Sequence, residues 1–310
     1  MSDVLRELPV LVLDCQASGA TPAYGDVLEL GWAVCSANGM QGPVRSSWIA
    51  PRTDRPVGRA VRELTGWSEA CLAEAVDEQA AWASLREAAA GIAQRELSGA
   101  VPSVIHYARF ELPFLRDLHE RSADPGAFPL DPLCVHAVAA RLFPDLPRRN
   151  IRALAGYLGH SPELLRRSAG HVEATAFIWQ KLVPLLDQAG VHTWSELHDW
   201  LGQTRGPGQR KRRVYPLARE RRRALPDAPG VYRFLRCNGD VLYVGKATSL
   251  RKRVASHFSG GARATERGLE LLTQVHDVAY SESASVLEAA LLESDEIKRI
   301  DPPYNVQLRS

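Results

Sequence analysis

Short apolar runs and longer helical repeats succeed one another along the chain. Residues 9–14 (PVLVLD) form an apolar run that ends in an acid, and residues 27–35 (VLELGWAVC) form a second run after a turn-rich stretch. Apolar runs of this length, bounded by glycine and proline, are typical of buried strands. We therefore expect two strands at the start of the chain, joined as a hairpin.

Helical spacing of alanine, tryptophan and leucine follows over residues 76–97, and residues 101–107 (VPSVIHY) resemble another strand. The periodicity predicts further helices at residues 110–121, 132–143, 150–158 and 171–188. Strands that come first and are then mixed with helices indicate an α/β or α+β fold.

The pattern restarts beyond a glycine-containing basic stretch at residues 203–224. Two short strand-like runs, 231–234 and 241–244, are separated by Cys-Asn-Gly-Asp, and Asn-Gly is the strongest short hairpin signal. Helices are expected at 250–258 and 284–299. The sequence thus predicts an α/β domain over 1–202, a basic linker over 203–224 and a small α+β domain over 225–310.

Composition places the chain among ordinary globular proteins. Its 310 residues suit two domains, and 45% hydrophobic with 24% charged residues is unexceptional. No run of 18 apolar residues and no secretory signal are present, so we expect a cytoplasmic bacterial protein, nucleoid-associated at work, with no membrane partner. Five cysteines, far apart and without a Cys-x-x-Cys pair, argue against both a disulfide framework and a zinc site.

Positive charge is concentrated in the predicted linker. Residues 203–224 carry a net charge of about +8 although the whole chain carries +2, which leaves about −6 elsewhere. A basic segment between neutral or acidic domains suits a polyanionic partner such as DNA, and the alternative is a solvated linker. The candidate DNA-binding residues are Arg210, Lys211, Arg212, Arg213, Arg221, Arg222 and Arg223.

Five motifs stand in order in the C-terminal part: PGVY at 229–232, YVGKA at 243–247, LRKRV at 250–254, LEAALLESDEIK at 287–298 and PPYN at 302–305. Together they resemble the GIY-YIG nuclease domain, in its UvrC/Cho form, over about 225–308. The resemblance implies a divalent cation, Mg²⁺ or Mn²⁺, held by Glu293, and one carboxylate with waters and phosphate oxygens is how Mg²⁺ is usually bound. It also implies that Asn305 closes the site.

The same resemblance gives the other catalytic positions their roles. Tyr232 and Tyr243 would orient or deprotonate the attacking water. A phenol is a weak base at neutral pH, so Lys246 and the metal are expected to favour its ionised form. Arg253 would grip the scissile phosphate with its forked donors. His257 stands where many relatives have tyrosine, and histidine can bind a phosphate or move a proton.

The N-terminal part resembles the DnaQ-like (DEDD) exonucleases over about 8–188, an RNase H-like fold with a mixed sheet and flanking helices. PVLVLDCQASG at 9–19, IHYARFELPFL at 105–115 and AGHVEATAFIW at 169–179 resemble that family's three motifs. The match of the active site is incomplete. Asp14 and Glu111 occupy two of the four acidic positions, whereas Gln16 and His171 stand in the others. Arg166 stands where that family usually has a histidine.

Two divalent ions need several carboxylates, so ordinary two-metal chemistry is not expected here. Three interpretations remain: an inactive, strand-binding scaffold; a one-metal site made by Asp14, Glu111 and His171; or an exonuclease with shifted ligands.

The motifs together predict a metal-dependent DNA endonuclease that acts in DNA repair or processing, on single-stranded, nicked or damaged duplex DNA. UvrA- or UvrB-type repair proteins are expected as partners by analogy. Two alternatives are a 3′–5′ exonuclease assisted by the GIY-YIG domain, and a DNA-binding scaffold without catalysis.

Overall fold

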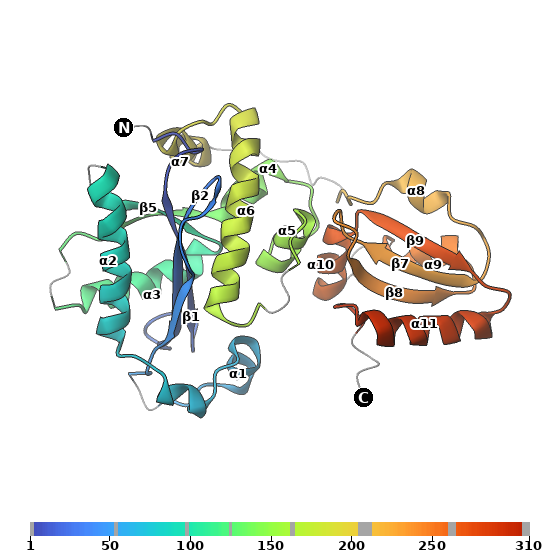
Figure 1. Cartoon of the computed structure of the whole chain (residues 1–310), viewed down its shortest axis with the longest axis horizontal. Coiled ribbons are helices and arrows are strands. Elements are labelled where there is room, and N and C mark those ends of the chain that lie inside the picture. The colour runs from blue at the N-terminus through green and yellow to red at the C-terminus, as the bar shows by residue number, and fades with distance from the viewer. Residues whose placement is uncertain are drawn as a thin grey trace. The chain divides into compact units, whose positions relative to one another are not determined.

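The computed structural model describes residues 3–52, 55–96, 99–123, 126–161, 165–203, 213–259 and 265–305. Tertiary contacts divide the chain into two compact units (Figure 1). The N-terminal unit comprises residues 1–142 and 162–206, and the C-terminal unit comprises 143–161 and 207–310. Among the helices of the described ranges, none is long and apolar enough to cross a membrane.

A mixed sheet forms the centre of the N-terminal unit. β1 (Val10–Ala17) pairs antiparallel with β2 (Val27–Ser36) and parallel with β5 (Val101–Ile105), which in turn pairs parallel with β6 (Leu130–Cys134). Two short strands, β3 (Gly39–Met40) and β4 (Arg45–Trp48), pair with β2. The parallel pairs bring the carboxyl ends of β1 and β5 to the same edge of the sheet.

Helices cover both faces of this sheet (Figure 1). α2 (Glu78–Glu96) and α3 (Ala108–Glu120) pack on the side to which Leu11, Leu13 and Cys15 point. α6 (Ser168–Gln188) packs on β1 and β2 from the other side. That approach is close, because a Cβ on Gly31 of β2 would lie 2.7 Å from the Ser168 hydroxyl. The remaining helices are α1 (Arg59–Thr65), the 3₁₀ helix η1 (Glu69–Ala73), α4 (Val135–Leu142) and α7 (Trp194–Gly202).

The C-terminal unit is built on a three-stranded antiparallel sheet. β7 (Gly230–Leu235) lies between β8 (Val241–Ala247) and β9 (Asp277–Glu282). The expected Asn-Gly turn joins β7 to β8, and Gly239 takes the positive φ of 90° that such turns require. The helices are α5 (Ile151–Tyr157), α8 (Arg219–Arg223), α9 (Leu250–His257), α10 (Glu266–Gln274) and α11 (Val286–Ile300).

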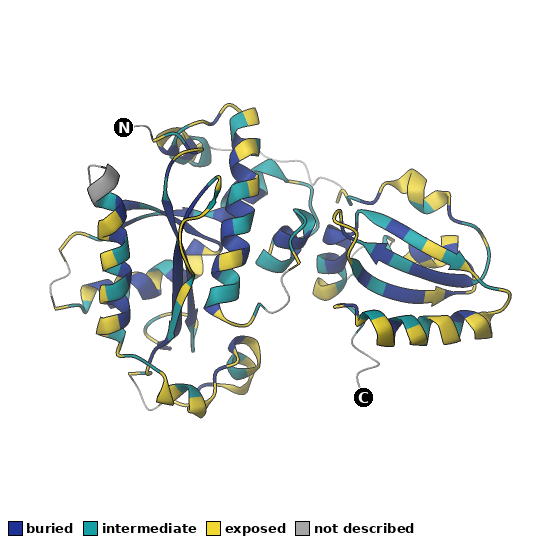
Figure 2. Cartoon of the chain, in the orientation of Figure 1, coloured by how far each residue is buried: buried dark blue, intermediate teal, exposed yellow. Residues whose placement is uncertain are grey.

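Alternation along β7 and β8 gives the C-terminal sheet two different faces. Tyr232 and Phe234 point into a core shared with Val254 of α9, whereas Val231 and Val244 pack with Ala289 of α11. Figure 2 shows the resulting dark-blue buried positions along β7 and β8, and along β1 and β2 of the other unit. A side chain on β7 or β8 therefore faces either α9 or α11, and this choice decides its neighbours in the site.

Two segments that the sequence suggested lay outside the small domain pack within the C-terminal unit. α5 contacts α10, and the ring of Tyr157 stacks on His276 with centroids 5.3 Å apart. Leu217, from the predicted linker, is 1% exposed in the core beneath α9. All five cysteines are free, as expected.

Candidate functional site

Two tyrosines and a histidine form a compact ring cluster on the α9 face of the C-terminal sheet. Tyr232 on β7 and Tyr243 on β8 lie with ring centroids 6.0 Å apart, and each lies 5.8 Å from the ring of His257. The Tyr232 hydroxyl and His257 Nε2 are hydrogen-bonded at 2.7 Å. His257, which stands where many GIY-YIG relatives have tyrosine, is therefore a direct hydrogen-bond partner of Tyr232.

Gly245 makes room for these rings. It lies opposite Tyr232 in the strand register, and a Cβ at this position would lie 2.6 Å from the Tyr232 hydroxyl and 2.7 Å from the Tyr243 ring. Gly245 was not singled out in the sequence, although its place two residues after Tyr243 in the YVGKA motif is the signal that could have found it. A larger side chain there would displace both phenols.

Burial keeps the Tyr232–His257 pair uncharged. Burial raises the pKa of Tyr232 above the usual value of a phenol, and Tyr243 adds to the rise. Burial, followed by the nearby Arg253 charge, lowers the pKa of His257 to about 4. The interaction with Tyr232 raises the pKa of Arg253 and outweighs burial, which lowers it. The arrangement thus offers neutral hydrogen-bonding groups beside a permanently charged guanidinium.

Glu293 and Lys246 lie on the opposite, α11 face of the sheet. Glu293 Oε1 accepts a hydrogen bond from the Lys246 backbone N–H at 2.9 Å, and Oε2 lies 3.2 Å from Lys246 Nζ. The Glu293 side chain is 18% exposed and that of Lys246 is 50% exposed. Lys246 thus pairs with the carboxylate, which differs from the expectation that it favours an ionised tyrosine, because alternation along β8 turns it away from the tyrosine rings.

Asn305 binds the free edge of β8. Its side-chain oxygen accepts from the Val244 N–H, and its amide nitrogen donates to the Val244 carbonyl, both at 2.8 Å. The Tyr304 N–H donates to the Leu242 carbonyl on the same edge at 3.2 Å. Together with Glu293 at Lys246, these contacts satisfy the outward backbone groups of an edge strand. Asn305 therefore fixes the strand that carries Tyr243 and Lys246.

The predicted C-terminal residues are thus brought together around one strand. Tyr243 and Lys246 belong to β8, whereas Arg253 and His257 of α9 lie on one side of the sheet and Glu293 of α11 lies on the other. A single divalent cation suits Glu293, because its carboxylate is partly exposed and Mg²⁺ keeps several waters when it is bound. The cationic Arg253 adds a second anion-binding group to the site.

In the N-terminal unit, Asp14 and Glu111 lie where the carboxyl ends of β1 and β5 meet. Glu111, in the first turn of α3, accepts a hydrogen bond from the Cys15 N–H at 2.8 Å. Burial raises the pKa of Glu111 well above its usual range, and the Asp14 charge raises it further. His171 Nδ1 lies 3.0 Å from Asp14 Oδ1. Burial lowers the pKa of His171, but the charge and hydrogen bond of Asp14 outweigh that effect and raise it overall.

Gln16 and Arg166 form part of the packing of this unit. The Gln16 amide donates a hydrogen bond to the backbone carbonyl of Arg166 at 2.6 Å. Opposite Gln16 in the register lies Glu29, which is fully buried and pairs with Arg167 at 2.6 Å. Glu29 also accepts from the Ser168 N–H at the start of α6. An acid within an apolar strand was the signal for this ion pair, which the sequence reading missed.

These residues do not fit a pair of divalent ions. Two carboxylates remain, burial favours the protonated form of Glu111, and Asp14 is engaged by an imidazole. Within the described ranges, no group of three or more His, Cys, Asp or Glu side chains is arranged to hold a metal ion.

The structure describes four of the seven candidate DNA-binding residues. Arg210, Lys211 and Arg212 lie outside the described residues, whereas Arg213 and Arg223 are exposed. Two further arginines make side-chain contacts: Arg221 pairs with Asp277 at 2.9 Å, and the Arg222 guanidinium lies 4.2 Å from the centre of the Phe258 ring.

Comparison with known proteins gives a family match within the C-terminal unit. Residues 228–306 match the family model described as the UvrC-like GIY-YIG domain. A Mycobacterium tuberculosis protein named for combined exonuclease and endonuclease activities is 32% identical over 212 residues, which are 68% of this chain and 32% of that protein. UvrABC system C proteins from several bacteria are 40% to 49% identical over 85 to 90 residues.

Solved structures resemble each part. The GIY-YIG endonuclease domain of Thermotoga maritima UvrC bound to magnesium is 31% identical, with 28% of this chain and 94% of that chain covered and a TM-score of 0.26. Exonuclease X in complex with 5′-overhanging duplex DNA is 17% identical, with 62% of this chain and 99% of that chain covered and a TM-score of 0.44.

The chain spans about a third of the length of the Mycobacterium tuberculosis relative, and 12% to 14% of the UvrABC system C proteins. Within the C-terminal unit, residues 228–306 match the UvrC-like GIY-YIG domain, and this stretch contains the tyrosine, arginine, histidine and glutamate positions described above.

Proposed function

We propose that the protein is a metal-dependent DNA endonuclease that cuts one strand through its GIY-YIG domain. The observation that carries this proposal is the convergence of the motif residues on β8. An arginine and two tyrosines lie on the α9 side of this strand, and a partly exposed glutamate lies on the α11 side. Hydrolysis of a phosphodiester requires an oriented water and cationic groups around the phosphate, and this arrangement supplies both kinds of group.

Each side chain has a role that follows from its contacts. Arg253 binds a non-bridging oxygen pair of the scissile phosphate through its planar donors. Tyr232 and Tyr243 orient the attacking water, and Tyr232 does so as a neutral hydroxyl group because burial opposes its ionisation. His257 holds the Tyr232 hydroxyl in place and stays neutral near pH 7.

Glu293 would hold the divalent cation, Mg²⁺ or Mn²⁺, which supplies charge neutralisation and a more acidic bound water. Lys246 balances the carboxylate charge before DNA arrives, and its exposed ammonium can move to a phosphate. Asn305 keeps β8 in register with these groups.

The N-terminal unit would bind DNA as a scaffold for the nuclease domain. This role is supported by its likeness to exonucleases together with carboxylates that do not fit two ions. A 3′–5′ exonuclease remains an outcome that experiment can distinguish. We place the protein in bacterial DNA repair or processing, in the cytoplasm, with UvrA- or UvrB-type partners as the analogy suggests.

Incubation of labelled single-stranded, nicked, branched and duplex DNA with Mg²⁺ or Mn²⁺ tests this function. We expect internal cuts that disappear in Glu293→Gln, which can keep the hydrogen bond from the Lys246 N–H. Asp295→Asn, a carboxamide substitution at an exposed position of the same helix, is the matched control and should cut normally.

A ladder that starts at the 3′ end and disappears in Asp14→Asn would instead assign the activity to the N-terminal unit. Absence of products with every substrate and both metals would contradict an enzymatic function and leave a DNA-binding scaffold.

A further inference from the structure

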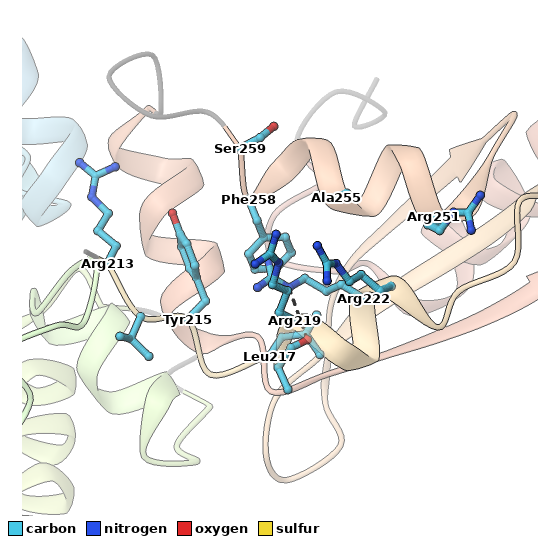
Figure 3. A pocket seen from close by; sticks show the side chains of 12 residues that line it. Arg213, Tyr215, Leu217, Arg219, Arg222, Arg251, Ala255, Phe258 and Ser259 are labelled. Carbon is cyan, nitrogen blue, oxygen red and sulfur yellow. Dashed lines mark hydrogen bonds between the residues drawn. The ribbon is translucent and has the colours of Figure 1, made fainter. Parts of the chain in front are cut away.

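A pocket of about 1180 Å³ lies beside the nuclease site, between α8 and α9 of the C-terminal unit. It is lined by residues of the chain just before α8, of α8 itself and of α9 with the residues that follow it. Figure 3 shows the cations spread along the pocket from Arg213 to Arg251, with Tyr215 and Phe258 between them. Three of the pocket's arginines, Arg213, Arg222 and Arg223, are candidate DNA-binding residues of the sequence.

Charge in the pocket has one sign. Five arginines line it and no acidic side chain does: Arg213, Arg219, Arg222, Arg223 and Arg251. The Arg251 guanidinium lies 2.9 Å from the Asp227 carboxylate. The Ser249 hydroxyl, followed by Arg251 and Lys252, keeps the pKa of Asp227 below its usual range, so this acid stays ionised. The side chains of Arg219 and Arg223 are exposed on α8, where they can attract a polyanion.

Aromatic rings interrupt the arginines. Tyr215 and Phe258 meet nearly perpendicularly with centroids 5.0 Å apart, and the Arg222 guanidinium covers Phe258 at 4.2 Å. Tyr215 is only partly buried, and it stands next to Arg213 in Figure 3. Rings set among arginines are how proteins hold single-stranded nucleic acid, since bases stack on the rings while phosphates bind the cations.

One helix joins the pocket to the catalytic cluster. Arg251, Ala255 and Phe258 of the α9 segment line the pocket at a spacing of four and three residues, which places them on one helix face. Arg253 and His257, also four residues apart, belong to the neighbouring face that carries the tyrosine contacts. A strand bound at Arg253 therefore needs to cross only one helix to reach the pocket.

We propose that this pocket binds a single-stranded stretch of the DNA next to the phosphate that is cut, with phosphates on Arg219 and Arg223 and a base against Tyr215. This assignment rests on the proposed nuclease function. A duplex is a rigid rod whose bases are stacked inside, so it can contact the rim but cannot place a base in a recess. The substrate would therefore be DNA that is unpaired on one side of the cut.

The test is binding of a labelled thymidine oligonucleotide of about 20 nucleotides, measured by fluorescence anisotropy without divalent metal so that it is not cut. The variant is Arg219→Gln/Arg223→Gln, whose two side chains are exposed and lie one turn apart on α8. Lys298→Gln/Arg299→Gln, in the last turn of α11, removes the same charge from the same unit and serves as the control.

We expect the α8 variant to raise the Kd about tenfold and to lower the slope of log Kd against log salt by about 1.4, as loss of two phosphate contacts requires. Tyr215→Leu should weaken single-strand binding about tenfold and leave duplex binding unchanged, whereas Tyr215→Phe should behave as the wild type. Equal effects of the α8 and α11 variants, or equal losses for single strands and duplex, would overturn the proposal.

Nicking in Mg²⁺ separates this proposal from the function on which it rests. Normal nicking and normal binding in the α8 variant would leave the nuclease function standing and remove the pocket from it. Pocket-dependent binding in a protein that cuts no DNA would support the pocket assignment and contradict the nuclease function.

Discussion

Tyr232 and His257 show how burial sets the chemistry of single residues in this site. Phenol and imidazole are hydrogen-bonded at 2.7 Å, and both pKa shifts favour the uncharged forms. Proton transfer from the phenol to the imidazole would create two buried charges, so the pair acts by orientation rather than by ionisation. The histidine thus replaces the more usual tyrosine without adding a charge at neutral pH.

We predict that the His257 ring titrates near pH 4, which NMR of its ring protons can measure, with the resonance assigned by its loss in His257→Gln. The unfolded chain binds a proton at about pH 6.5 and the folded one at about 4, so stability rises with pH between these values and falls as the solution is acidified. The full effect is on the order of 3 kcal/mol.

His257→Gln keeps a hydrogen-bonding side chain but cannot titrate, and its stability should change less between pH 4 and 6.5. His171, whose pKa is raised in the folded protein, acts in the opposite sense. The stabilisation that its protonated ring contributes is lost as the pH rises above that pKa. A ring midpoint near 6.5 for His257 would contradict the account.

At the scale of elements, strand β8 organises the nuclease site. It lies at the edge of its sheet, and its outward backbone groups are bound by Tyr304, Asn305 and Glu293 rather than by another strand. The residues that hold the edge come from α11 and the segment after it. These late motifs of the sequence therefore fix the edge strand that carries Tyr243 and Lys246.

Asn305→Ala should destabilise the C-terminal unit by about 1–2 kcal/mol, because the Val244 N–H and carbonyl both lose their partner. Differential scanning calorimetry measures this loss. Asn305→Asp keeps an acceptor for the N–H but places an oxygen against the carbonyl, and it should be no more stable than the alanine variant. An alanine variant that melts like the wild type would show that the edge does not depend on this residue.

Long periodic elements could be predicted from the sequence, and short or polar ones could not. The first hairpin, α2, α3, α6 and the Asn-Gly hairpin lie where expected. β6 was read as part of a helix over 132–143, because Asp131 and Pro132 break its alternation while α4 follows directly. α10 and β9 were missed although α10 is amphipathic, and the polar strand β4 offered no apolar run.

The sequence predicts which residues form the site, but it does not predict how their side chains are arranged around the sheet. The motifs named Tyr232, Arg253 and Glu293, whereas the division of these side chains between two faces of the sheet depends on register. The pairing of Lys246 with Glu293 follows from that register. Pocket residues such as Tyr215 and Phe258 come together only through packing between α9 and the chain before α8.

At the scale of the whole molecule, residues 143–161 link the two folded units through the chain. This segment continues directly from α4 of the N-terminal unit, yet α5 packs on α10 of the C-terminal unit. Asn150 donates to Glu270 at 2.8 Å, and a Cβ on Gly156 would clash with Gln274. The C-terminal unit is thus completed by a segment that lies in the sequence between the two parts of the N-terminal unit.

A double-mutant cycle on Tyr157→Ala and His276→Ala tests this docking. The stacked rings should give a coupling energy of about 0.5–1.5 kcal/mol in the free energy of unfolding, read from denaturant titrations. A coupling energy of zero would mean that α5 does not rest on the C-terminal unit in solution.

The central claim is that Glu293, held beside Lys246 at the edge of β8, serves a strand-cutting centre. The most direct measurement is the rate of single-strand incision in Mg²⁺ by Glu293→Gln relative to Asp295→Asn, with both variants shown to be folded. The account predicts that the Glu293 variant loses at least about a thousandfold in rate while the Asp295 variant stays near the wild type. Equal rates in the two variants would contradict it.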